Sequence, residues 1–169
     1  MSSSISKGDV VQSIVALRRA RKVWRKRHEA GFIGGPSTNE DGSKNLHEWN
    51  FSFPGKKGSL YGGKRFKIRM KFSNEYPEAP PKVFFTEQMF HPNIFSDGQV
   101  CLSILSYGGW NRDKPITMNA ILVALQVFLL EPNPDDPVNV LASGLFKEKK
   151  IEYEAKVKAV IASMEDHSY

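Results

Sequence analysis

Cysteine is almost absent from this 169-residue chain, which has only Cys101. One thiol cannot form an internal disulfide or a four-thiolate zinc site, so both of these means of stabilising a fold are excluded. The sequence also lacks a secretory leader pattern and any apolar run long enough to span a membrane. We therefore expect a protein of the nucleus and cytoplasm, without a membrane partner, whose thiol stays free.

Acidic residues are scarce where the chain is most basic. Lys and Arg number 24 against 18 Asp and Glu, a formal net charge of +6, and Glu29 is the only acid between Val10 and Thr38. Helical periodicity predicts a helix from its N-cap Asp9 to about His28, with an apolar face of Ala16, Leu17, Ala20, Val23 and Trp24. The opposite, basic face is either a solvated surface or a docking surface for an acidic partner.

Apolar and polar residues alternate in two later segments, as half-buried strands require. These segments are 49–53 and 66–72, and shorter candidate strands lie at 32–33 and 83–85. Because no helix-length segment separates them, they predict an antiparallel meander. Residues 1–8 are small and polar, so we expect a flexible tail followed by one domain over residues 9–169.

The C-terminal part of the chain reads as helical. After the N-cap Thr117, apolar residues at spacings of three and four predict a central buried helix formed around Met118, Ile121, Leu122, Leu125, Phe128 and Leu129. Asp136 and Pro137 are typical of the cap and first residue of a further helix, and 147–164 is expected to form a last one. The fold class predicted is α+β.

The stretch FHPNIFSDGQVCLSIL, residues 90–105, holds the best candidate for chemistry. Pro92, Asn93 and Gly98 predict a stiff turn just before Cys101. A thiolate can take an acyl group while an amide N–H steadies the oxyanion, which suits acyl transfer. A lone cysteine is also often an inert small hydrophobe, and both interpretations stay open on composition alone. His91 suits a hydrogen bond that fixes the loop better than it suits catalysis.

HPNIFSDGQVCLSIL resembles the active-site segment of ubiquitin-conjugating (E2) enzymes. YPEAPPK upstream, a cysteine eight residues after Asn93, and a loop followed by a long apolar helix occur in the family's order from about Leu17 to Tyr153. WRKRHEAGF, PGKKGSLYGG and CLSIL are similar to the SUMO-conjugating branch of that family. The resemblance implies the ubiquitin-conjugating fold, with an N-terminal helix, a four-stranded meander, an active-site loop, a central helix and C-terminal helices.

This resemblance also implies roles for individual residues. Cys101 would accept SUMO from its activating enzyme (E1) as a thioester and pass it to a substrate lysine; the alternative is the same chemistry with ubiquitin or another modifier. Asn93 would order the active-site loop or stabilise the oxyanion, and Asp136 would orient and desolvate the lysine. The acceptor protein would contact Lys82, Phe95, Asp97, Gln99, Pro137 and Val138. The E1, and SUMO bound noncovalently, would contact Arg21, Lys22, Arg25 and His28.

Further partners implied by the resemblance are substrate proteins and E3 ligases, and no cofactor is expected because the E1 uses the ATP.

The sequence departs from the SUMO branch at four positions near the thiol: the branch has Lys, Tyr, Ser and Thr where this chain has Phe84, Phe95, Asp97 and Gln99. A carboxylate therefore occurs where the acceptor's acid would lie. We therefore expect the usual acidic acceptor consensus to be relaxed. Trp110 is spaced differently from the family pattern, which indicates a small insertion. Nucleic acid is the less favoured partner, because aromatic residues do not interleave the basic face.

Overall fold

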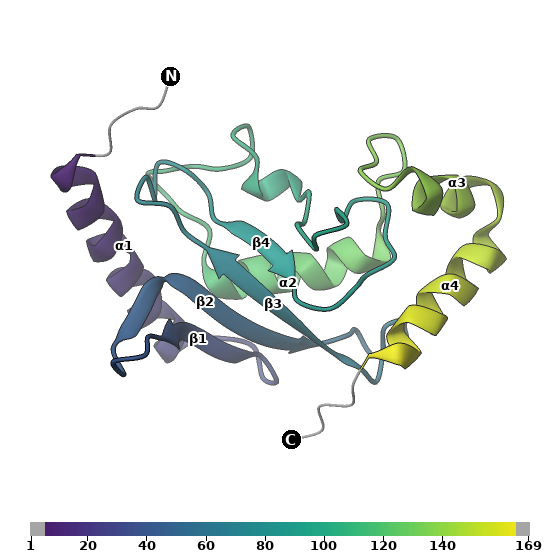
Figure 1. Ribbon diagram of the computed structural model, residues 1–169, viewed down its shortest axis with the longest axis horizontal. Coiled ribbons are helices and arrows are strands. Elements are labelled where there is room, and N and C mark those ends of the chain that lie inside the picture. The colour runs from purple at the N-terminus through teal and green to yellow at the C-terminus, as the bar shows by residue number, and fades with distance from the viewer. Residues whose placement is uncertain (1–5, 165–169) are drawn as a thin grey trace.

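The computed structural model describes residues 6–164 (Figure 1). Its elements, in chain order, are α1 (Lys7–Lys26), β1 (Ile33–Thr38), β2 (Lys44–Pro54), β3 (Arg65–Lys71), β4 (Lys82–Phe85), the 3-10 turn η1 (Ser103–Leu105), α2 (Met118–Leu130), α3 (Val140–Glu148) and α4 (Lys150–Ser163). The strands form one antiparallel sheet in the order β1-β2-β3-β4, which confirms the predicted meander and the α+β class. Within the described range, no helix combines the length and the apolar character needed to cross a bilayer.

The core lies between the sheet and α2. The register pairs Trp49 with Met70 and Phe51 with Ile68, and all four side chains are buried. Figure 1 shows α2 running behind the sheet, and its buried residues are the six predicted from the sequence. The helix begins as expected, because the Thr117 side chain accepts a hydrogen bond from the Ala120 N–H at 3.2 Å. Each such buried side chain contributes about 1.5–3 kcal/mol to stability.

The start of α1 differs from the prediction. Ser6, not Asp9, is the N-cap: the Asp9 N–H donates to Ser6 Oγ at 3.2 Å, and the Ser6 N–H donates to Asp9 Oδ2 at 2.9 Å. This reciprocal capping box starts the helix at Lys7, inside the segment predicted as a tail. The Ser6 bonds also hold the pKa of the Asp9 carboxyl below its usual value. Residues 1–5 of that predicted tail lie outside the described residues.

The packed face of α1 matches the predicted one except at Val23, because Leu17 and Trp24 are buried and Ala16 and Ala20 pack partly buried against the core. Ser13, Leu17 and Trp24 are buried, whereas Val23 is 48% exposed. At 100° per residue the three buried side chains share one direction, and Val23 points about 100° away from it. A small polar residue can sit at the centre of this face because Ser13 Oγ donates to the Val10 carbonyl at 2.9 Å.

Two predictions about the C-terminal helices are wrong. The helix expected at Asp136 begins at Val140, because Asn139 is the N-cap and its Oδ1 accepts from the Ala142 N–H at 3.0 Å. The single helix expected over 147–164 is interrupted at Lys149, whose φ of −141° and ψ of 61° are not helical. The result is α3 and α4, which pack against each other at the opposite end of the sheet from α1 (Figure 1).

Candidate active site

Cys101 follows a narrow hairpin that the sequence builds from local turn residues. Phe95 donates its N–H to the Gln99 carbonyl at 2.9 Å, and Gly98 donates to the Phe95 carbonyl at 2.9 Å. Gly98 has φ of +87°, and a Cβ there would lie 2.3 Å from the Phe85 carbonyl oxygen, so glycine is required. The Cys101 N–H donates to the Asn93 carbonyl at 3.0 Å. The backbone on both sides of the hairpin therefore fixes the position of the thiol.

The thiol is exposed, in contrast to the inert, buried cysteine that composition alone allows. It lies between two grooves, which we name after their far walls. The helix groove, of about 640 Å³, is lined by Cys101, Leu102, Ala124, Val127, Asn133 and Asp136, among others. The strand groove, of about 650 Å³, is lined by Cys101, Leu102, Lys71, Pro81, Lys82 and Tyr107, among others. Chain segments can therefore approach the sulfur from two sides.

Asn93 has its side chain fully engaged in holding the loop that follows α2. Its Nδ2 donates to the carbonyls of Asn133 at 2.8 Å and Asp136 at 3.1 Å, and its Oδ1 accepts from the Asn133 N–H at 2.8 Å. The residue is only 4% exposed. Both amide hydrogens are thus bound to carbonyl groups of the loop that follows α2. Donation to an oxyanion would require one of these bonds to break.

His91 lies beneath the hairpin and is completely buried. Its Nδ1 accepts from the Asn93 N–H at 3.1 Å, so Nε2 carries the proton and donates to the Phe128 carbonyl at 3.1 Å. Burial lowers the pKa of the imidazole to about 4, against the weaker opposing effect of the Phe128 carbonyl. The ring is therefore neutral at pH 7, and its hydrogen bonds match the predicted loop-fixing role.

Asp136 reaches the site through the loop that Asn93 holds. Its side chain is exposed and lines the helix groove together with Cys101. The same loop is tied to α3, because Ser143 Oγ donates to the Pro134 carbonyl at 2.8 Å and Lys147 Nζ lies 2.8 Å from Asp135 Oδ1. The structure thus brings the three predicted catalytic residues, Cys101, Asn93 and Asp136, to one place.

The predicted acceptor-binding residues divide between two surfaces. Lys82, Phe95 and Gln99 line the strand groove next to Cys101. Phe95 also lines a third groove with Asp97 and Val138, on the far side of the hairpin. Pro137 is half-buried and lines none of the three grooves. Phe84 faces outward, with Lys71 Nζ 5.4 Å from its ring centroid.

The predicted E1-binding residues lie on α1, remote in sequence from the thiol. Lys22 and Arg25 are exposed, and Arg21 is half-buried. His28 follows the helix; its ring stacks on Trp24 at 4.1 Å, and its Nδ1 lies 2.9 Å from the Trp24 carbonyl oxygen. These residues form a surface of their own, and none of them lines the three grooves around the active-site hairpin.

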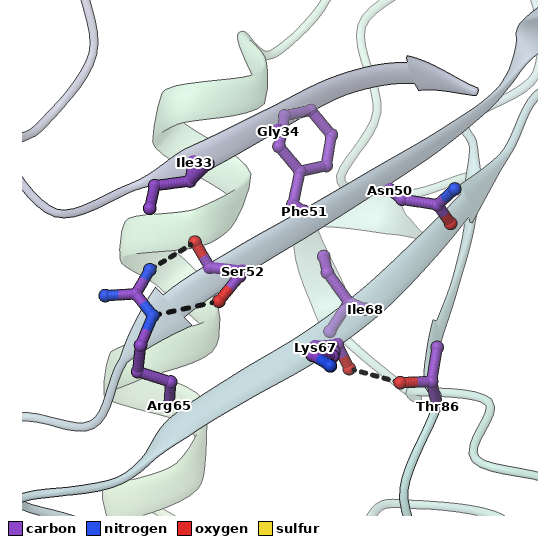
Figure 2. A pocket seen from close by; sticks show the side chains of 9 residues that line it. All are labelled: Ile33, Gly34, Asn50, Phe51, Ser52, Arg65, Lys67, Ile68 and Thr86. Carbon is purple, nitrogen blue, oxygen red and sulfur yellow. Dashed lines mark hydrogen bonds between the residues drawn. The ribbon is translucent and has the colours of Figure 1, made fainter. Parts of the chain in front are cut away.

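A separate hollow of about 430 Å³ lies over β1–β3 (Figure 2). Ile33 and Ile68 contribute apolar wall, and Arg65 crosses one end, where its Nε donates to Ser52 Oγ at 3.1 Å. Thr86 Oγ1 donates to the Lys67 carbonyl at 3.3 Å at the other end. None of its lining residues lines the helix groove or the strand groove, so this hollow is distinct from the thiol's surroundings.

Sequence reasoning missed several residues that shape the site. Val127 lines the helix groove and is 40% exposed, although α2 was predicted only as a buried helix. Its position outside the stripe of buried residues was the available signal. Trp110, noted only for its spacing, donates its Nε1 proton to the Pro77 carbonyl at 2.7 Å and so ties the loop after η1 to the proline-rich segment.

These features, an exposed cysteine held by an HPN turn beside a sheet and a central helix, define a class of acyl carrier. The family described as "Ubiquitin-conjugating enzyme" matches residues 16–161, and the chain belongs to that family. Among its relatives is "SUMO-conjugating enzyme SCE1" of Arabidopsis thaliana, 41% identical over 94% of each chain. "Sumo-conjugating enzyme ubc9" of Dictyostelium discoideum is 43% identical over 87% of this chain and 92% of its own. "SUMO-conjugating enzyme UBC9" of Caenorhabditis elegans is 40% identical over 84% and 85%.

Proposed function

We propose that this protein is an E2 enzyme that accepts SUMO from a SUMO-activating E1 as a thioester on Cys101 and transfers it to substrate lysines. The observation that carries the proposal is the exposed Cys101 between two grooves, in a chain about 40% identical to three proteins named as SUMO-conjugating enzymes. Because these relatives align over more than four-fifths of the chain, they favour SUMO over ubiquitin as the modifier.

The first step is a thioester exchange. The Cys101 thiolate attacks the carbonyl carbon of the E1-bound modifier, a new S–C bond forms, and the E1 cysteine leaves as a thiolate. We assign the modifier's C-terminal tail to the helix groove, which Leu102 and Val127 line with apolar side chains beside Cys101. The loop that Asn93 ties down contributes Asn133 and Asp136 to the lining of this groove, so the Asn93 hydrogen bonds hold that wall in place relative to Cys101.

The second step transfers the acyl group to a lysine. A neutral amine attacks the thioester, the Cys101 thiolate leaves, and the amine loses its extra proton to solvent. A free lysine has a pKa of about 10.4, so only about one copy in 2,500 is neutral at pH 7. We assign Asp136 the task of orienting and desolvating that amine, since its carboxylate lines the groove that holds Cys101.

The remaining partners follow from this assignment. We place E1 binding and noncovalent SUMO binding on Arg21, Lys22, Arg25 and His28, because acidic partner surfaces are attracted to a basic helix that is distinct from the active site. The same proposal includes E3 ligases and substrate proteins as partners, and the nucleus and cytoplasm as the location of the protein.

The test is a thioester assay with purified SUMO, its E1 and ATP. We expect an adduct on Cys101 that disappears with reductant. The Cys101→Ser variant should give a reductant-resistant ester, and Cys101→Ala should give none. A parallel reaction with ubiquitin and its E1 measures selectivity. No adduct with SUMO but a clear one with ubiquitin would refute the modifier, and no adduct with either would refute the carrier function.

A further inference from the structure

A third groove lies on the far side of the active-site hairpin from the strand groove. This hairpin groove has a volume of about 660 Å³, and its walls come from residues 85–90, the hairpin tip 94–98 and the segment 138–140. None of the residues that we assign to thioester chemistry lines it. Its place next to a lysine-modifying centre nevertheless makes it accessible to the protein that donates the lysine.

The hairpin groove adjoins the active site at Phe95 and comes near it in sequence at Val138. Phe95, 43% exposed, lines both this groove and the strand groove that contains Cys101. Val138 lines it as well, two residues after Asp136. Along the hairpin, Asp97 is four residues before Cys101, so their Cα atoms are at most about 13 Å apart. Three or four residues of an extended acceptor span about 10–13 Å, so a residue at that separation from the modified lysine can reach Asp97.

Asp97 gives the hairpin groove a negative charge, and no lysine, arginine or histidine lines this groove. Asp97 is exposed; its Oδ1 accepts from the Gln99 N–H at 2.9 Å, and no cation of residues 6–164 forms an ion pair with it. On the other side of the hairpin, the strand groove carries two lysines, Lys71 and Lys82, and one acid, Glu75. A segment that crosses the sulfur therefore meets a net positive charge on one side and the Asp97 carboxylate on the other.

Exposed apolar side chains border the hairpin groove. Val140 lines it and is 77% exposed, and the next residue, Leu141, is 61% exposed. Both lie in the first turn of α3, which the Asn139 cap and the Pro92 carbonyl fix in place: Pro92 accepts from the N–H groups of Val138 and Asn139 at 2.9 and 3.0 Å. A rigid apolar edge beside an acidic groove suits a partner segment that is both apolar and basic.

We propose that the hairpin groove selects acceptor proteins that carry an arginine or lysine three or four residues from the modified lysine, together with an apolar side chain that packs on Val140. This inference rests on the proposed function and adds a substrate class to it. The cation pairs with Asp97 in partly exposed surroundings, and its replacement by an acid turns attraction into repulsion. Contacts of this kind change rates by about fivefold.

The test uses synthetic acceptor peptides and enzyme already loaded with modifier. E1 is stopped with EDTA, and single-turnover transfer is followed with peptide pairs that differ only in Arg or Glu, placed three or four residues before or after the lysine. For the native enzyme we expect an Arg-to-Glu rate ratio of about five at one of these positions, falling towards one at high salt. A ratio of one or below at every position overturns the inference.

Two variants assign the effect to its residues. Asp97→Asn keeps the acceptor oxygen for the Gln99 N–H but removes the charge, so the ratio should fall to about one. The matched control Asp113→Asn removes an exposed acid from the loop after η1 and should leave the ratio at the native value. Val140→Ser should slow transfer to a leucine-containing peptide more than to its serine counterpart. An unchanged ratio in Asp97→Asn refutes the inference alone, whereas failure of the native enzyme to load SUMO refutes the proposed function and, with it, the inference.

Discussion

Asn93 offers the sharpest test of how this active site works. The structure commits its side chain to three hydrogen bonds with the loop that carries Asp136, at 2.8, 3.1 and 2.8 Å. At about 1 kcal/mol net for each bond, Asn93→Ala should lower the free energy of unfolding by about 3 kcal/mol, because the side chain is buried and water cannot replace it without cost. Urea unfolding at pH 7 measures this loss.

The kinetic consequence separates a positioning role from an oxyanion role. If Asn93 acts by placing Asp136, then Asn93→Ala and Asp136→Ala should each slow single-turnover transfer to lysine, by up to about 100-fold, and the double variant should be no slower than the slower single variant. If Asn93 donates to the oxyanion, its loss should add a further factor of about 10² to 10³ in the double variant.

The assay is discharge of preloaded thioester to saturating free lysine, with intact folding of each variant checked by circular dichroism. Multiplicative losses in the double variant, combined with an unfolding free energy within about 0.5 kcal/mol of the native value, would refute the loop-positioning role. Asn133→Ala is a useful companion, since it removes a side chain of the same loop but keeps the backbone carbonyl and N–H that Asn93 binds.

Three further perturbations have defined outcomes. Because the pKa of His91 is lower in the folded protein, the unfolded chain binds the proton first as the pH falls. The free energy of unfolding is therefore retained above about pH 6.5 and declines by about 3 kcal/mol by pH 4. Urea unfolding of His91→Gln should lack this contribution and show a shallower pH dependence than the native chain. Ser6→Ala should cost about 1 kcal/mol by removing the α1 cap, and an unchanged melting temperature would contradict the capping role. The double variant Arg21→Glu with Arg25→Glu should slow thioester formation at limiting E1 by about tenfold, and by less at high salt. The control Lys44→Glu, at the start of β2, should have no effect; equal slowing by this control would refute a specific α1 surface.

The parts of the fold that depend on local pattern were predictable. Trp49, Phe51 and Phe53 alternate with polar residues. Such alternation indicates a strand with one buried face and one exposed face. The α2 helix was equally clear, because Thr117 is a strong cap and the apolar residues after it repeat at helical spacing. In both cases the order of apolar and polar residues along the segment is enough to predict the element, although the partners that bury it lie elsewhere in the chain.

The prediction of a helix at Asp136 failed because a distant residue decides the local structure. Asp136 and Pro137 have the local chemistry of a helix start, but the Asp136 carbonyl accepts from Asn93, 43 residues away, and this bond holds the segment as a loop. Asn139 then caps α3 instead. Neither Lys149 nor its immediate neighbours are glycine or proline, so nothing local predicts the break; Phe146 of α3 and Tyr153 of α4 pack edge to face across it, with ring centroids 5.2 Å apart.

The same dependence on distant contacts explains how an exposed thiol can sit in a defined place. Cys101 itself contributes only a backbone bond to the hairpin. Its surroundings are set by His91 and Asn93, two polar residues with almost no exposure, whose side chains are satisfied by backbone groups of α2 and of the loop after it. Burying these side chains is favourable only when all of their hydrogen bonds form together, so the hairpin, α2 and the loop adopt one relative arrangement. The exposed Cys101 is thereby held in a fixed position by buried residues. Substitution of His91 or Asn93 should therefore slow transfer to lysine, although neither variant alters the thiol itself.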